Sequence, residues 1–120
     1  MGLVAIVLIA LIAALHFYIM WFEMFAWESR GPKVFASFAP DIFPKTKAMA
    51  ANQGLYNGFL GAGLIWSLLI GDPVYSKNVA LFFLICVFIA GVYGALTVSK
   101  RIIYVQTVPS GLAILALMLG

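Results

Sequence analysis

Four long apolar stretches follow one another along this chain of 120 residues, and the charged residues lie almost entirely between them. A helix needs roughly 20 apolar residues to cross the hydrocarbon core of a bilayer. The stretches do not alternate in polarity as the strands of a membrane barrel do, so helices are the expected spanning form. We therefore predict an all-α integral membrane four-helix bundle, a single transmembrane domain over residues 1–120, with helices at 2–27, 50–70, 78–98 and 102–119.

The composition supports a chain that is surrounded by lipid. Apolar residues make up 65% of the sequence and charged residues only 9%, and the mean hydropathy is +1.12. A soluble domain carries about 25% charged residues because its surface must be hydrated. The first apolar stretch is too long for the core of a signal peptide and has no basic region before it, so we expect it to be retained.

The same composition excludes several function classes. The basic residues form no face with base-reading groups, so no nucleic acid partner is expected. A single cysteine, Cys86, and a single histidine, His16, supply too few ligands for a zinc site. We expect no metal and no cofactor, and the lipid bilayer is the expected surrounding.

The basic residues lie unevenly among the connections. The positive-inside rule places connections rich in Lys and Arg in the cytoplasm. The second connection contains only Lys77, and the first and third are therefore predicted to be cytoplasmic, with both termini outside. Six of the seven basic residues lie in these two connections: Arg30, Lys33, Lys45, Lys47, Lys100 and Arg101.

The first connection is too long for a simple turn. Pro32, Pro40 and Pro44 prevent one continuous helix through it. Its apolar and aromatic residues alternate with lysines, a mixture that suits the boundary between membrane and water. We predict an interfacial segment, either a short helix or a lid, over residues 31–47.

Two ionisable residues lie inside the first predicted helix. His16 and Glu23 are seven residues apart and project from nearly the same face, with Met20 between them and Trp27 continuing the stripe. The histidine would lie about 10 Å deeper than the glutamate. Ionisable groups within a membrane helix are costly, so they are functional candidates by default. The alternatives are a histidine that only packs and a glutamate whose carboxylate reaches back to water.

Polar residues on the other helices occur at i, i+4 spacings and, after antiparallel threading, at a similar depth in the cytoplasmic half. The pairs are Gln53 with Asn57, Tyr93 with Thr97, and Gln106 with Ser110. Such residues also hydrogen-bond between helices without any further function, and the tyrosines fit an aromatic belt. The predicted substrate- or proton-binding site consists of His16, Glu23, Gln53, Tyr56, Asn57, Tyr93, Thr97 and Gln106.

Small residues predict where helices approach closely. Gly54 and Gly58 form a G-x-x-x-G with Gly61 near the same face, and Gly91 and Gly94 lie in the third helix. Glycine lets two helix backbones pack together, either within one chain or between two copies.

These motifs together resemble one known family, the small bacterial membrane proteins catalogued as domain of unknown function 1304. The resemblance covers essentially the whole chain and implies a bacterial inner-membrane location, but it supplies no activity. It rests on the following residues: His16, Met20, Glu23, Met24 and Trp27; the run Asn52-Gln53-Gly54-Leu55-Tyr56-Asn57-Gly58-Phe59-Leu60; Ala90, Gly91, Tyr93, Gly94 and Thr97; and Gln106 with Pro109.

Three functions remain open from the sequence. The leading one is a binding or proton-coupled transport protein for a small polar or amphiphilic molecule, with Glu23 and His16 exchanging protons. Transport would need a homodimer. The second is a membrane-embedded enzyme for a lipid-like substrate, in which His16 or Glu23 is the general base and Tyr56 or Tyr93 donates a hydrogen bond. The third is an accessory membrane subunit in which the polar residues only set the helix register.

Overall fold

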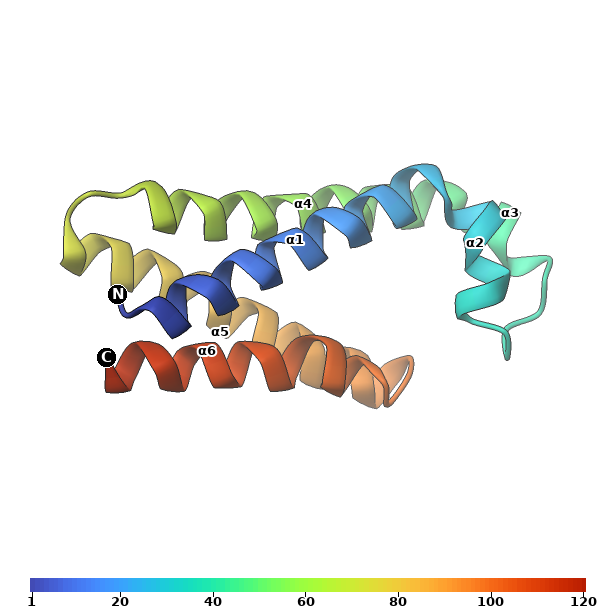
Figure 1. The fold of residues 1–120 in the computed structure, drawn as a ribbon. Helices are drawn as coiled ribbons and strands as arrows, with labels where there is room; N and C mark the ends of the chain where they lie inside the picture. The colour runs from blue at the N-terminus through green and yellow to red at the C-terminus, as the bar shows by residue number, and fades with distance from the viewer.

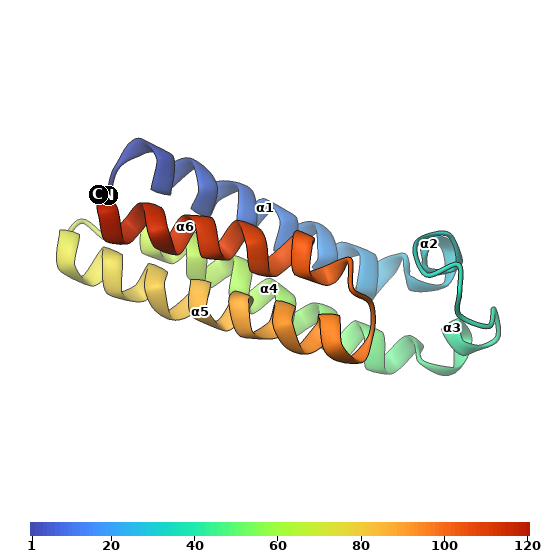
Figure 2. The ribbon, with the colours of Figure 1, turned by 90° about the horizontal axis from the view of Figure 1, so that it is seen from below.

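The computed structural model describes residues 1–120 and contains helices and no strands, which confirms the predicted all-α class. Four long helical segments lie side by side, and both termini lie at one end of them (Figures 1 and 2). Two short helices, α2 and α3, lie at the opposite end, which we call the α2–α3 end. The elements are α1 Leu3–Phe25, α2 Trp27–Val34, α3 Ile42–Lys45, α4 Lys47–Leu69, α5 Pro73–Thr97, the π-helix η1 Ile103–Thr107 and α6 Val108–Leu119.

Two of these helices, α1 and α5, are long and apolar enough to cross a membrane. Helix α4 has 23 residues, as many as α1, but carries Asn52, Gln53 and Asn57 in its first half. The last two elements form a shorter apolar helix over Ile103–Leu119. The apolar stretches of the sequence thus correspond to the four long segments.

The first helix ends earlier than predicted. The prediction of a helix to residue 27 is wrong because Ala26 leaves the helical region, with φ −128° and ψ 15°, and α2 begins at Trp27. This bend lets the indole N–H of Trp27 donate to Thr46 Oγ1 at 2.9 Å, at the start of α4. A long-range contact, which the local sequence does not reveal, therefore decides this boundary.

The third long helix begins earlier than predicted, at Pro73 rather than residue 78. Asp72 caps it, since its Oδ1 accepts from the backbone N–H groups of Val74 and Tyr75 at 2.9 and 3.1 Å. Proline is favoured in the first helical turn because its missing N–H has no helical partner there. The turn signal at Gly71-Asp72-Pro73 is therefore also the start of the helix.

The last long segment opens as a π-helix and not as the α-helix predicted from residue 102. The N–H of Val108 bonds to the carbonyl of Ile103, five residues earlier, and α6 begins at this point. Pro109 consequently lies in the first turn of α6, directly after the π-helical turn.

The connection predicted as one interfacial segment folds into two short helices, and Pro32 lies inside α2. An aromatic cluster holds them together, and the most deeply buried member, Phe43, is only 1% exposed. A Cβ at Gly31 would lie 2.5 Å from the Phe43 ring, so only glycine permits this approach. The cluster consists of Phe22, Trp27, Phe35, Phe38 and Phe43.

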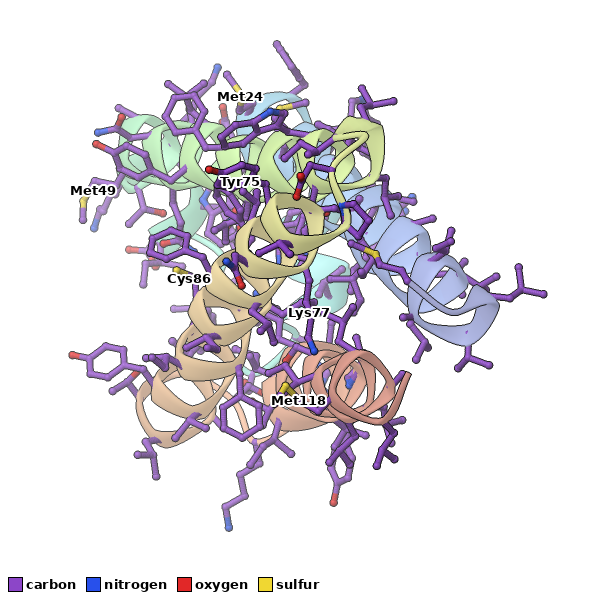
Figure 3. All side chains as sticks on the ribbon, turned by 90° about the vertical axis from the view of Figure 1, so that its left-hand side faces the viewer. Met24, Met49, Tyr75, Lys77, Cys86 and Met118 are labelled. Carbon is purple, nitrogen blue, oxygen red and sulfur yellow. The ribbon has the colours of Figure 1, made fainter.

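The interior is built from small residues and the exterior from large ones. Viewed along the helices, large side chains extend outward from all four long segments (Figure 3). Only 26 of the 120 residues are buried, and many of these are Ala, Gly or Ser, whereas Leu96 and Leu119 are more than three-quarters exposed. The core that joins the four segments consists of Ala5, Ile9, Ile12, Ala13, Leu64, Ala80, Leu84, Val87, Ala113 and Leu117.

The glycines of α4 bring it against α1. A Cβ at Gly54 would lie 2.9 Å from Glu23 Cβ, one at Gly58 would meet Met20, and one at Gly61 would lie 3.2 Å from the carbonyl oxygen of Ala13. The G-x-x-x-G of this chain therefore packs two of its own helices together.

Replacing Gly54 tests this close packing. We expect Gly54→Leu to lower the free energy of unfolding by at least about 2 kcal/mol, because a side chain forced between two tightly packed backbones must displace them. Gly71→Leu is the control, since no atom lies within 4 Å of a Cβ at this position. Thermal unfolding followed by far-UV circular dichroism measures both. Equal stability of the two variants would contradict the proposed contact.

Candidate functional site

The carboxylate of Glu23 is the centre of the first polar group. Glu23 lies in the last turns of α1, is only 8% exposed, and faces α4. The side-chain amide of Gln53 donates to its Oε2 at 2.9 Å, and the amide of Asn57 donates to its Oε1 at 2.7 Å. Both carboxylate oxygens are therefore bound by neutral donors from one face of α4.

No positive charge balances this carboxylate. The structure contains two ion pairs, Lys45 with Asp41 and Lys47 with Glu28, and neither includes Glu23. Amide donors stabilise an ionised carboxylate, but they do not cancel its charge. Glu23 is thus able to accept either a proton or a positively charged group.

The local sequence of α4 explains how two short amides reach this carboxylate. Gly54 follows Gln53 directly, and Gly58 follows Asn57. These glycines let the α4 backbone approach Met20, Glu23 and Met24 closely. Larger residues at either position would hold the amides away from the carboxylate.

The imidazole of His16 is the centre of a second polar group. His16 is completely buried in α1, and its Nδ1 lies 2.8 Å from the carbonyl oxygen of Ile12. Because a carbonyl only accepts, Nδ1 carries the hydrogen and Nε2 is left as an acceptor. The side-chain amide of Gln106 lies 3.1 Å from Nε2 and donates to it. The contacts therefore define a neutral histidine with both ring nitrogens satisfied.

Gln106 belongs to the π-helix η1, and α5 packs tightly against this turn. A Cβ at Gly91 would collide with Thr107 and Gln106. The Ser110 hydroxyl donates to the carbonyl of Gln106 at 2.6 Å, and the Thr107 hydroxyl donates to the carbonyl of Phe88 at 3.2 Å. This geometry holds the amide of Gln106 opposite His16.

The predicted site residues thus form two groups rather than one. One group joins α1 to α4 through Glu23, and the other joins α1 to η1 through His16, with no hydrogen bond between them. The stripe from His16 through Glu23 does not continue to Trp27, because the chain bends at Ala26.

Three predicted residues are not brought to either group. Tyr56 and Tyr93 are 59% and 69% exposed on the outside of the helices, and no hydrogen bond joins their hydroxyls to Glu23 or His16. The hydroxyl of Thr97 donates to the carbonyl of Tyr93 on its own helix. Two apolar grooves also lie elsewhere, one between α4 and α5 beside Trp66 and one between α5 and α6 beside Phe88.

Other polar contacts were not anticipated from the sequence. The guanidinium of Arg101 donates to the carbonyl of Val34 at 2.7 Å and so joins the end of α2 to the turn after α5. The hydroxyl of Ser76 donates to the carbonyl of Ser67 at 2.7 Å, beside the turn between α4 and α5. Both contacts link residues brought together only by the fold, and no local pattern marks them.

Comparison with known proteins places the chain in a family. Residues 10–118 match the family described as "Protein of unknown function (DUF1304)", and the chain belongs to it. The chain is also similar to the uncharacterized protein YpaA of Lactococcus lactis subsp. lactis (strain IL1403), with 34% identity over 119 residues, covering 98% of this chain and 96% of that protein. No solved structure matches the chain. The resemblance seen in the sequence is confirmed.

Replacing Asn57 tests the hydrogen bonds to Glu23. We expect Asn57→Leu to lower the free energy of unfolding by about 1.5–3 kcal/mol, because a buried carboxylate loses one of its two donors. Asn52→Leu on the same helix is the control, since Asn52 is exposed and outside the group. Thermal unfolding of the two variants at neutral pH makes the comparison. If both variants unfold at the wild-type temperature, the amide of Asn57 does not support Glu23.

Proposed function

We propose that this chain is a multi-pass membrane protein in which α1, α4, α5 and η1–α6 cross one bilayer as a four-helix bundle. The distribution of residue sizes supports this proposal. Helices in lipid gain little from hiding large apolar side chains and associate instead through small residues and interhelical hydrogen bonds. Large apolar residues accordingly face outward on every long segment, for example Leu3, Phe59, Phe82 and Leu115.

The α2–α3 end is proposed to lie at the cytoplasmic surface of the bacterial inner membrane. Six of seven basic residues lie at this end, in the first and third connections. Helices α2 and α3 and the turn between them would lie at the boundary of lipid and water, with their aromatic cluster packed against the end of α1. The two termini would then both lie outside.

We infer that Glu23 is the binding group for a proton or for the cationic part of a small amphiphilic molecule. The single observation that carries this proposal is a buried carboxylate whose only partners are neutral amides. Gln53 is an exposed residue and Asn57 a partly exposed one, so we expect a ligand to reach the carboxylate from the edge of α4. Four helices enclose little room, and proton-coupled transport by this protein would therefore require a homodimer.

The geometry supports binding better than the alternative of an enzyme. A general base needs a partner within hydrogen-bond reach of the reacting group. Neither Tyr56 nor Tyr93 lies beside Glu23 or His16, so the proposed acid and base are not assembled. An accessory subunit would need the same hydrogen bonds to Glu23 as a binding protein. Loss of ligand binding in Glu23→Gln would distinguish the two roles.

Cysteine labelling in intact cells tests the topology. In a Cys86→Ala background, we expect a membrane-impermeant maleimide to label Gly71→Cys, in the turn between α4 and α5, and to leave Ser99→Cys, after α5, unlabelled. Permeabilised cells should label both. Labelling of Ser99→Cys alone would reverse the proposed orientation, and labelling of both in intact cells would exclude membrane crossing by α5.

Binding and flux of the lipophilic cation tetraphenylphosphonium test the role of Glu23. We expect saturable binding to the purified protein, and counterflow of protons in reconstituted vesicles, to be lost in Glu23→Gln because the variant carries no charge to exchange. Glu28→Gln is the control, since Glu28 is an exposed acid in α2. Neither binding nor flux in the wild-type protein, or equal activity of Glu23→Gln and wild type, would contradict the proposal and favour an accessory role.

A further inference from the structure

Arg30 does not extend into water from α2 but folds back along the outer face of α1. Its guanidinium donates to the hydroxyl oxygen of Tyr18 at 3.3 Å and lies 5.9 Å from the centre of the Trp21 ring. The rings of Tyr18 and Trp21 are themselves 5.8 Å apart. Two aromatic side chains from α1 thus hold a cation from the next helix.

This cation has no anionic partner in the chain. The two acids of the first connection are already engaged, Glu28 with Lys47 and Asp41 with Lys45. Lys33 lies three residues after Arg30 in α2, is exposed, and forms no ion pair. Residues three apart share a helix face, so Arg30 and Lys33 present two unbalanced positive charges together.

The unused donors at this position fit a phosphodiester. A guanidinium has five N–H groups in a planar fork that matches two phosphate oxygens. The Tyr18 oxygen accepts from one of these N–H groups, so the others remain free. Because the Tyr18 oxygen accepts from Arg30, its own O–H remains free to donate. Tyrosine and tryptophan are also the residues that occupy the head-group level of a membrane.

An apolar stripe leads away from this position along the same face of α1. Val7, Leu11 and Ala14 precede Tyr18 at spacings of three and four residues, and all three are exposed. Glu23 and His16 lie on the opposite face. An acyl chain can therefore lie along the stripe while its head group contacts Arg30.

We propose that Tyr18, Trp21, Arg30 and Lys33 form a binding site for the head group of an anionic phospholipid. The proposal rests on the membrane placement proposed above and is independent of the role of Glu23. The apolar stripe favours a lipid over free phosphate, which would gain nothing from it. Lys33 strengthens the preference for a lipid with net negative charge over a zwitterionic one, whose own ammonium group it would repel.

Native mass spectrometry of the full chain in detergent tests this site. Phosphatidylglycerol and phosphatidylcholine with matched acyl chains are titrated separately, and the first dissociation constant is measured for each. We expect the wild-type protein to bind phosphatidylglycerol about tenfold more tightly, as one charge-assisted hydrogen-bonding site predicts. Inorganic phosphate added to the same samples should not compete at concentrations comparable to the lipid.

Four variants identify the source of the preference. Arg30→Gln should remove most of the preference for phosphatidylglycerol. Arg30→Lys should reduce this preference because an ammonium lacks the planar fork. Tyr18→Phe should also reduce the preference, because one hydrogen-bond donor is lost. Lys77→Gln, which removes one charge at the end of the molecule opposite α2 and α3 (Figure 3), should keep the lipid preference. Tyr18→Phe changes only the hydroxyl of an exposed side chain, so it keeps the test valid if an Arg30 variant unfolds.

Several results would overturn the proposal. Unchanged preference in Arg30→Gln and Tyr18→Phe would exclude these residues, and an equal loss in Lys77→Gln and Arg30→Gln would show only diffuse attraction of charge. Competition by inorganic phosphate would assign the site to free phosphate. A wild-type protein that stays in solution without detergent and does not enter vesicles would refute the membrane placement itself, whereas entry without lipid preference would refute this site alone.

Discussion

The close contact between α1 and α4 is the constraint on which the rest of the structure depends. It exists because Gly54, Gly58 and Gly61 put no side chain between the two backbones. The same contact brings the amides of Gln53 and Asn57 within 3 Å of the Glu23 carboxylate. The close packing of α1 against α4 and the hydrogen bonds to Glu23 therefore depend on each other. A change that separates the two helices would also leave the buried carboxylate without its donors, and this cost adds to that of the lost packing.

The arrangement of residue sizes follows from the solvent that we propose for this chain. In water, large apolar side chains go inward because burial removes them from the solvent. In lipid this difference vanishes, and helices associate where small residues permit close approach. Buried Ala80 and Ala113 inside the fold, and exposed Phe82 and Leu115 a few residues away, illustrate this inversion. Polar residues of such a protein are therefore expected in the contacts between helices or at the helix ends.

The two buried polar groups differ in what they are able to do. His16 is fully satisfied by Ile12 and Gln106, which suits a residue that fixes η1 against α1. Glu23 has hydrogen-bond donors for both carboxylate oxygens but no positive charge beside it, and its two partner residues are exposed (Gln53) and partly exposed (Asn57). We therefore infer a structural role for His16 and a binding role for Glu23. On the opposite face of α1, Arg30 shows the reverse imbalance, with its positive charge placed against the Tyr18 hydroxyl and the Trp21 ring.

The sequence by itself determined the helical class, the approximate positions of the four long helices and the polar face that Gln53 and Asn57 share, because apolar length and helical periodicity are local properties. It also indicated that Gly54 and Gly58 lie at a helix contact. Only the tertiary structure decided that Glu23 and His16 belong to different groups and that Tyr56 and Tyr93 face outward. The tertiary structure also set the end of α1, where the Trp27 indole hydrogen-bonds to Thr46, and made the turn before α6 a π-helix. The rotation of each helix about its axis, and the long-range partners that follow from it, depend on how all helices pack together, and no local pattern contains that information.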